Sequence, residues 1–361
     1  MRSPSTGTTE DLSSANFRQG RQGTCSLGAS PVEGLRMAHA FAHDPVMVDE
    51  VVALLRPVPP GVVVDGTVGG GGHAAALLGA HEHLTVLGLD RDPHAVAAAR
   101  ARLLPFGRRA VVRQAAFAEL AREIDLLAMS RPEMWAAAPG HPAKVSGVLL
   151  DLGVSSPQLD TPERGFSYRR SGSLDMRMDP GSAHSAADLV NTASEQELAR
   201  LFAANGEGSL SRRIARAVVA ARPLRTTTEL ADVVAAAVPA AARRRGHPAR
   251  RVFQALRIEV NDELAQLAAA LPPALERLVP AGRLIVISYH SGEDRLVKAA
   301  FAEAVAGGCT CPPGLPCVCG AQPEHELVFR GARTPSAAEV ERNHRAESAR
   351  LRAVERIEAA S

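Results

Sequence analysis

The sequence predicts an α/β fold in which a Rossmann-like parallel sheet carries an inserted all-helical domain. Short apolar runs alternate with helical segments as far as Asp151, a pattern typical of a parallel sheet with helices on both faces. One of these runs, Val62–Asp65, leads into four consecutive glycines at Gly69–Gly72, and glycine permits the tight turn and close approach that a bound nucleotide requires. Residues 161–271 are first turn-rich and then helical, without a strand signal, which indicates the insertion.

The composition is that of a soluble globular protein with one large or two modest domains. Hydrophobic residues make up 46% and charged residues 22% of the 361 residues, so the chain can bury a sizeable core. Residues 1–37 are rich in Ser, Thr and Gly and lack the apolar stretch of a secretory signal, so we predict a disordered tail and a cytoplasmic location. No uncharged apolar run is long enough to cross a membrane. Because the net charge is only +2, any surface that binds nucleic acid must be a local basic patch.

Strands and helices alternate in the first half of the chain. Strands are predicted at Val62–Asp65, Thr85–Asp90, Ala110–Arg113 and Gly147–Asp151. Helices are predicted at Val46–Leu55, Ala74–Ala80, Pro93–Leu104 and Phe117–Leu127. Three of the four strands end in a carboxylate, at Asp65, Asp90 and Asp151. Although turns favour Asp in general, ligands of such sheets bind beyond the carboxyl ends of the strands, so these three residues are candidates for a site.

The second half begins with helices and then returns to the sheet. Helical segments are predicted at Glu195–Ala204, Ser209–Ala221, Thr227–Val238 and Arg251–Leu271, with Thr226 and Glu229 resembling a capping box. The strand pattern resumes at Gly282–Ser288 and is followed by a helix at Glu293–Ala304. The sheet domain is therefore predicted to be discontinuous, comprising residues 38–160 and 272–361 around an insertion at 161–271. Glu326–Arg330 and Ser348–Ile357 are candidates to close the sheet, although the second also fits a charged helix.

The glycine turn and Asp90 together predict a site for a nucleoside cofactor. An acid about 20 residues beyond such a turn can bind the hydroxyls of a ribose. Gly69, Gly71 and Ala74 also satisfy the dinucleotide pattern, so an NAD(P)-dependent dehydrogenase is one interpretation. Two features favour S-adenosylmethionine instead. Asp65 precedes the glycines, where an acid can meet the cationic end of that molecule, and residues 151–160 leave the fourth strand with Asp and Pro, as in enzymes that methylate amino groups.

Several ordered motifs resemble the RsmH (MraW) family of bacterial ribosomal RNA methyltransferases. The matching segments are His43–Val46, Asp65–His73, Asp90–Asp92, Asp151–Asp160, Arg164–Ser167, Asp175–Asp179, His247–Ala249, Phe253–Ile258 and Ile287–Ser291. The resemblance implies a class I methyltransferase that uses S-adenosylmethionine to methylate the N4 of a decoding-centre cytidine in 16S ribosomal RNA of the small subunit. A catalytically silent RNA-binding protein with the same fold is the other alternative. The sequence does not decide whether the chain is a monomer or a homodimer.

The resemblance also implies which residues form the site. The cofactor-binding residues would be Gly71, Gly72, His73, Asp90, Phe117, Asp151 and Gln158. The two glycines would approach the methionine part, Asp90 the ribose and Phe117 the adenine, whereas by themselves His73 and Phe117 fit a surface histidine and a core aromatic. Asp151 is the candidate catalytic residue, as an acceptor for the amino protons of the target base.

RNA would be bound by basic clusters and a shaped cleft, because aromatic residues make up only 3% of the chain. The candidate clusters are Arg169-Arg170 beside Tyr168, Arg212-Arg213, Arg243–Arg245 and Arg250-Arg251. In the family pattern, Tyr289 stands where phenylalanine is usual. The acidic run at Asp175–Asp179 fits either a metal site or a salt-bridged loop, and a structural or RNA-positioning role is favoured. His290 with Ser291 fits a substrate loop better than a nucleophile, because no serine–histidine–acid signature accompanies them.

Four of the five cysteines crowd together near the C-terminus, at Cys309, Cys311, Cys317 and Cys319. Four thiolates so close in sequence can bind zinc, yet Cys-x-Cys pairs are less typical of zinc sites than Cys-x-x-Cys pairs. Because methyl transfer from a sulfonium needs no metal, no residue is predicted to be a metal ligand. A loop of reduced thiols is the favoured interpretation, with a zinc site as the alternative.

Overall fold

The computed structural model describes residues 45–136, 138, 140–240, 246–309, 311 and 318–358. The predicted tail at residues 1–37, His43, the basic cluster Arg243–Arg245 and Cys317 lie outside these ranges. Within them, no helix is both long and apolar enough to span a lipid bilayer.

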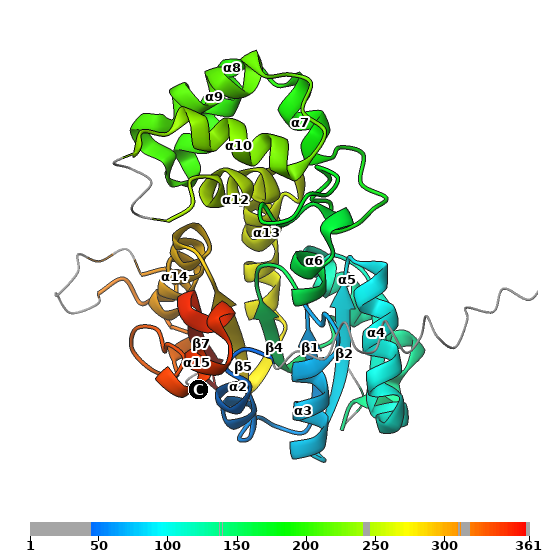
Figure 1. Cartoon of the computed structure of the whole chain (residues 1–361). Coiled ribbons are helices and arrows are strands. Elements are labelled where there is room, and N and C mark those ends of the chain that lie inside the picture. Colours follow the sequence, from blue (N-terminus) through cyan, green and yellow to red (C-terminus); the bar gives the residue numbers. More distant parts are fainter. Residues whose placement is uncertain are drawn as a thin grey trace, which may run out of the picture.

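A seven-stranded sheet in the order β3-β2-β1-β4-β5-β7-β6 forms the base of the molecule (Figure 1). Its strands are β1 (Gly61–Asp65), β2 (Leu84–Asp90), β3 (Ala110–Gln114), β4 (Val145–Asp151), β5 (Leu278–Ser288), β6 (His325–Leu327) and β7 (Arg350–Arg356). The first five strands of this order are parallel, which confirms the predicted α/β class. Strand β7 runs antiparallel to β5, and β6 runs antiparallel to β7. The segment near residues 348–357 is therefore a strand and not a helix. Its register places Glu355 opposite Arg283, and these side chains form an ion pair with a 2.6 Å N–O distance.

Helices cover both faces of the sheet because alternate strand residues point to opposite sides. Val62 and Val64 of β1 belong to one core, together with apolar residues of α5 (Leu120–Ser130), α13 (Glu263–Glu276) and α14 (Ser291–Ala306). Val63 belongs to a second core with α2 (Val48–Leu55) and part of α3 (Gly72–Ala80). A third cluster joins α3 to α4 (Pro93–Leu103) and strand β2. The sheet therefore has helices on both faces, as predicted.

Five further helices form a separate layer above the carboxyl ends of the strands (Figure 1). They are α7 (Ala186–Thr192), α8 (Glu195–Phe202), α9 (Ser211–Ala220), α10 (Thr227–Ala237) and α12 (Ala249–Val260). Helix α6 (Ser156–Asp160) lies lower, beside α5, and α15 (Ala337–Arg342) lies near the C-terminus. Apolar side chains from α7 to α12 share a core of their own. The predicted capping box is present: Thr226 Oγ1 accepts the Glu229 N–H, and Glu229 accepts the Thr226 N–H.

The prediction of one continuous helix over Arg251–Leu271 is wrong. It divides into α12 and α13 at Asn261 and Asp262, and Asp262 has a left-handed φ of 52°. The buried Asn261 side chain accepts the Met178 N–H at 2.8 Å and donates to the Met176 carbonyl at 2.8 Å, so it holds a neighbouring loop at the break. Apolar residues of α13 pack in the sheet core, so the packing favours an insertion that ends near Asn261. The domain limits at 161 and 271 stay a prediction.

Candidate active site

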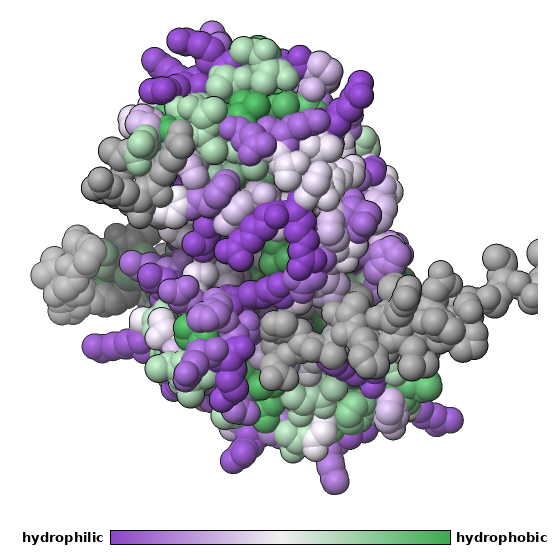
Figure 2. All heavy atoms as spheres, viewed as in Figure 1, coloured by the Kyte–Doolittle hydropathy of each residue, from purple (hydrophilic) through white to green (hydrophobic). Residues whose placement is uncertain are grey.

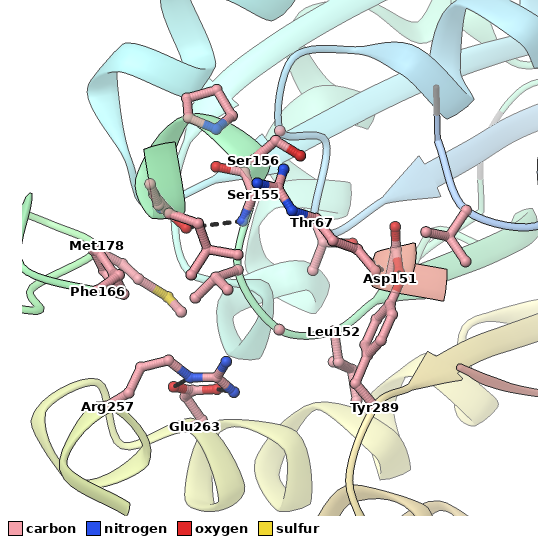
Figure 3. A pocket seen from close by; sticks show the side chains of 18 of the residues that line it. Thr67, Asp151, Leu152, Ser155, Ser156, Phe166, Met178, Arg257, Glu263 and Tyr289 are labelled. Carbon is pink, nitrogen blue, oxygen red and sulfur yellow. Dashed lines mark hydrogen bonds and ion pairs between the residues drawn. The ribbon is translucent and has the colours of Figure 1, made fainter. Parts of the chain in front are cut away.

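A cleft of about 790 Å³ lies between the carboxyl ends of the strands and the helical layer. Its lining combines the glycine turn, the loop at 151–160, residues 166–170, the α12–α13 region and the C-terminal segment 344–348. On the face in Figure 2, hydrophilic side chains gather across the middle of the molecule, between the helical layer and the base. Figure 3 shows the interior: Asp151 and Tyr289 face Arg257 and Glu263 across open space.

The glycine turn is held in place by Asp90. Its Oδ2 accepts the Gly69 N–H at 3.0 Å, and its Oδ1 accepts the Asp92 N–H at 2.9 Å. Burial raises the pKa of Asp90 to about 6, so the carboxylate is ionised at neutral pH. Gly71 has a left-handed φ of 79° and caps α3, but it is not among the residues that line the cleft. Gly72 does line it, and a Cβ there would come within 3.2 Å of the Pro45 ring.

Asp65 lies beneath the turn and not on the cleft surface. It is 1% exposed, does not line the cleft, and its Oδ1 accepts the Thr67 N–H at 3.3 Å. Its Oδ2 is buried without a hydrogen-bond partner among the described residues. Burial raises the pKa of this carboxyl to about 7, opposed by the nearby His73. Asp65 therefore does not border the cleft in this structure, whereas Thr67, which donates its N–H to Asp65, does.

Asp151 stands at the end of β4 with two side-chain neighbours. The Tyr289 hydroxyl donates a hydrogen bond to Asp151 Oδ1 at 2.7 Å (Figure 3). His73 Nδ1 lies 3.7 Å from Asp151 Oδ2. The Asp151 N–H donates to Thr67 Oγ1 at 2.7 Å, which fixes the strand end. His73 Nε2 lies 2.9 Å from the Val46 carbonyl, which requires the proton on Nε2 and leaves Nδ1 toward Asp151.

Tyr289 is itself held from behind by the start of α14. Its N–H donates to the buried Glu293 carboxylate at 2.8 Å. Burial raises the pKa of Tyr289 well above its usual value, and the Asp151 charge acts in the same direction, so the hydroxyl remains a donor. His290 caps the same helix by accepting the Gly292 and Glu293 N–H groups. Its Nδ1 is occupied by capping, which agrees with the prediction that it is not part of a nucleophile.

Gln158 and Phe117 line the cleft, but each is also tied into the protein. The Gln158 side chain donates to Asp92 Oδ2 at 3.0 Å and accepts the Ser155 N–H at 3.0 Å, so both ends of its amide fold the loop onto α4. Arg164 joins the same Asp92 oxygen at 2.8 Å. Phe117 packs partly against the sheet core and partly faces the cleft, so it combines the two roles considered from the sequence.

The wall opposite Asp151 carries an ion pair that was not predicted from the sequence. Arg257 Nε and Nη2 donate to the two Glu263 oxygens at 2.7 and 2.8 Å, bridging α12 and α13. Both residues line the cleft, with Phe166 and Met178 beside them (Figure 3). The only available signal was the position of Arg257 within the matching segment Phe253–Ile258, because a sequence does not show that two helices meet.

Some of the predicted basic clusters reach the cleft. Arg169, Arg170 and Arg250 line it, whereas Arg212 and Arg213 on α9 do not. Arg345 from the C-terminal segment also lines it and pairs with Asp160 at 2.7 Å.

One ring beside these arginines is already stacked. The ring of Tyr168 stacks on His247, with 4.6 Å between ring centroids, and meets Phe253 edge-on at 5.8 Å. The His247 stack covers one face of the ring, so Tyr168 forms part of the cleft wall.

The acidic run at Asp175–Asp179 forms a salt-bridged loop. Arg177 binds both Asp175 oxygens at 2.8 Å, and this guanidinium holds the pKa of Asp175 below its usual range. Asp179 accepts the Gly181 N–H at 2.8 Å. These contacts agree with the structural role that was favoured over a metal site.

The sequence is similar to known proteins along nearly its whole length. Residues 40–357 match the model of the MraW methylase family. A protein from Heliobacterium modesticaldum, named Ribosomal RNA small subunit methyltransferase H, is 48% identical over 326 residues, which cover 88% of this chain and 99% of the relative. A protein of the same name from Thermobifida fusca is 50% identical over 329 residues, which cover 89% of this chain and 95% of the relative.

Proposed function

Because the chain belongs to the MraW methylase family, we propose that it methylates the exocyclic N4 of a decoding-centre cytidine in 16S ribosomal RNA, with S-adenosylmethionine as methyl donor. The observation that carries the proposal is the cleft in which the glycine turn, Asp90 and Asp151 converge at the carboxyl ends of parallel strands. The names of the relatives support the substrate class. Neither a dehydrogenase nor a catalytically silent RNA-binding protein finds support in the family match.

The glycine edge of the cleft fits the methyl donor. When bound, S-adenosylmethionine supplies a methyl group on a positively charged sulfur. Gly72, His73, Asp90 and Phe117 line the cleft and are the proposed contacts. Each carboxylate oxygen of Asp90 already accepts one backbone N–H and has capacity for one more donor, as two ribose hydroxyls require. Gly71 and Gln158 are proposed to support the site without direct contact. Gly71 shapes the turn, and Gln158 holds the loop at 151–160.

Asp151 is the proposed catalytic residue. The lone pair of a cytosine amino group is delocalised into the ring, so an acceptor for its protons makes the nitrogen a better nucleophile. Tyr289 fixes one oxygen of Asp151, and the bond from the Asp151 N–H to Thr67 fixes the backbone, so the carboxylate is oriented before the base arrives. Ser155 and Ser156 shape the loop beside it. The target base must leave its stack to reach this depth.

The RNA backbone is proposed to follow the basic side chains at the mouth of the cleft. Arg169, Arg170 and Arg250 lie on the side of the helical layer, and Arg345 approaches from the C-terminal segment. Phosphate contacts from these groups would supply affinity without extensive base stacking. Since the substrate is the small ribosomal subunit, the cytoplasm is the proposed compartment, and a homodimer is compatible with the proposal.

The proposal is tested by incubating the protein and methyl-labelled S-adenosylmethionine with small subunits that lack the modification. Transfer of label to the 16S RNA supports the proposal. Failure of transfer, together with an intact fold and measurable binding of the methyl donor, would favour the silent RNA-binding alternative. Calorimetric titration with S-adenosylmethionine and with NAD(P) separates the methyltransferase from the dehydrogenase.

A further inference from the structure

Three cysteines converge in the connection between α14 and β6. Cys309 follows the end of α14, and its N–H donates to the Ala306 carbonyl at 3.0 Å. Although Cys319 is ten residues further on, its Sγ lies 3.6 Å from Cys309 Sγ. The sulfur atoms of Cys309, Cys311 and Cys319 all lie within 4.8 Å of one another. None of the three lines the cleft, so the cluster is separate from the proposed active site.

The sulfur spacing fits a tetrahedral metal ion. Zinc binds thiolates at about 2.3 Å, so two sulfurs on one tetrahedral ion are about 3.8 Å apart. The 3.6 Å between Cys309 and Cys319 is close to this value and far longer than the roughly 2.05 Å of a disulfide. Cys309 and Cys319 therefore have the spacing of two corners of a zinc–thiolate tetrahedron, and Cys311 Sγ lies within 4.8 Å of both.

The surrounding backbone orients one of the three sulfurs. The Val318 N–H donates to Cys311 Sγ at 3.3 Å. Such N–H donors to sulfur are the kind of outer contact that orients metal ligands. This hydrogen bond and the sulfur spacing therefore point the same way.

The ends of the connection already meet at its base. A Cβ on Gly307, which has a left-handed φ of 57°, would come within 2.6 Å of Pro323 Cα, so these backbones are in close contact. The cysteines thus belong to a loop whose closure is set by the fold. A metal ion bound to both arms of such a loop would stabilise its closed form.

We propose that Cys309, Cys311 and Cys319 bind one structural Zn²⁺ as thiolates, with a fourth ligand completing the tetrahedron. The ion would fix the course of the connection between α14 and β6, at the antiparallel edge of the sheet. It would take no part in methyl transfer, because the cysteines lie outside the cleft.

The full-length chain, expressed in cells and purified without chelators or added metal, is the material for the test. Elemental analysis is expected to find about one zinc per chain, and the Cys309→Ser/Cys319→Ser variant is expected to hold almost none. Cys25→Ser, which changes the one cysteine remote in sequence, is the matched control and should retain the metal. Circular dichroism of each variant establishes that it is folded.

A second measurement tests metal binding even if the protein loses its metal during purification. Metal-free protein titrated with Co²⁺ should develop thiolate-to-cobalt charge transfer and the intense visible bands of tetrahedral coordination, and the double variant should not. Zinc added afterwards should abolish both the charge-transfer absorption and the visible bands. Wild-type protein that holds no zinc and shows no tetrahedral cobalt spectrum would overturn the proposal, as would equal zinc content in a folded double variant.

Discussion

The hydroxyl of Tyr289 donates a 2.7 Å hydrogen bond to Asp151, joining the end of β5 to the end of β4 across 138 positions of sequence. The two residues stand at neighbouring strand ends because β4 and β5 pair in parallel, with Asp151 beside Ile287. Glu293 fixes Tyr289 from behind, so α14, Tyr289 and Asp151 form a continuous support for one carboxylate. If Asp151 is the catalytic acceptor, Tyr289 is its positioning residue.

Replacing Tyr289 with phenylalanine is expected to slow methyl transfer and spare the fold. The change removes only the hydroxyl that orients Asp151, and a hydrogen bond to a charged group contributes about 1.5–3 kcal/mol. We therefore expect kcat to fall about tenfold or more, with the KM for S-adenosylmethionine nearly unchanged. Tyr168→Phe makes the same change at the chain's other tyrosine and should leave kcat nearly unaltered. Equal rates for wild type and Tyr289→Phe would remove the positioning role.

Asp151→Asn is expected to lower kcat about 100-fold or more, because the amide is a poor acceptor for the amino protons of the base. Binding of S-adenosylmethionine, followed by calorimetry, should change much less. Asp232→Asn alters an exposed carboxylate on α10, outside the cleft, and serves as the control. Unchanged turnover of Asp151→Asn would exclude it as a catalytic residue, and an equal loss of cofactor affinity would make it an anchor for the cofactor alone.

Asp65 should make stability fall as pH rises. Its pKa is about 7 in the folded chain against 3.8 for the ordinary carboxyl, so between these values the folded state keeps a proton that the unfolded state has lost. The unfolding free energy of wild type should therefore fall by on the order of 4 kcal/mol between about pH 4 and pH 7, relative to Asp65→Asn. Urea unfolding across this range gives the comparison.

Asp125 offers a control of opposite sign for the same experiment. Its hydrogen bonds to Arg277 lower its pKa, so its contribution to stability is present above the unfolded pKa and is lost as pH falls. Asp125→Asn should therefore remove stability near neutral pH and little in acid. Parallel pH profiles for wild type and Asp65→Asn would contradict the assignment of a buried, protonated Asp65.

Removing the charge of one partner of the Arg257–Glu263 ion pair should lower the free energy of unfolding more than replacing both partners. Glu263→Gln leaves a mostly buried guanidinium without this counter-charge, which costs up to about 3–5 kcal/mol. Arg257→Met combined with Glu263→Leu removes both charges and is expected to be less destabilising than Glu263→Gln. Urea unfolding of the three proteins measures the difference. A loss below about 0.5 kcal/mol for Glu263→Gln would mean that solvent screens the pair.

The basic mouth of the cleft should determine how RNA binding depends on salt. Each phosphate contact contributes about 0.7 to the slope of log affinity against log salt for a single strand. Changing Arg169, Arg170 and Arg250 together to glutamine should therefore lower the slope by about two. The Arg212→Gln/Arg213→Gln protein, altered away from the cleft, should keep the wild-type slope. An unaltered slope in the triple variant would refute the role of the cleft arginines. Charge reversal at Arg243–Arg245 stays a separate prediction with the same readout.

Local patterns predicted the parts of the fold and site that depend on neighbouring residues. The glycine turn, the strands that end in Asp65, Asp90 and Asp151, and the Thr226 cap all follow from short-range rules of backbone geometry. The break at Asn261 could not be predicted from such rules, because it depends on hydrogen bonds to Met176 and Met178 that form only when the chain is folded.

Contacts between distant segments could not be predicted from the sequence either. Tyr289 was noticed as a departure from the family pattern, but its bond to Asp151 depends on which strands pair. The Arg257–Glu263 pair requires the angle between α12 and α13, which no periodicity specifies. Conversely, Asp65 was recognised as acidic and well placed, but not as buried beneath the turn, because burial depends on tertiary packing.

The most direct test of the central claim is nucleoside analysis of small-subunit RNA after reaction with wild type and with Asp151→Asn. We expect wild type to convert a single decoding-centre cytidine to N4-methylcytidine, dependent on S-adenosylmethionine, and Asp151→Asn to form little of this product. Methylation at another atom or another nucleotide, or equal product from both proteins, would contradict this claim.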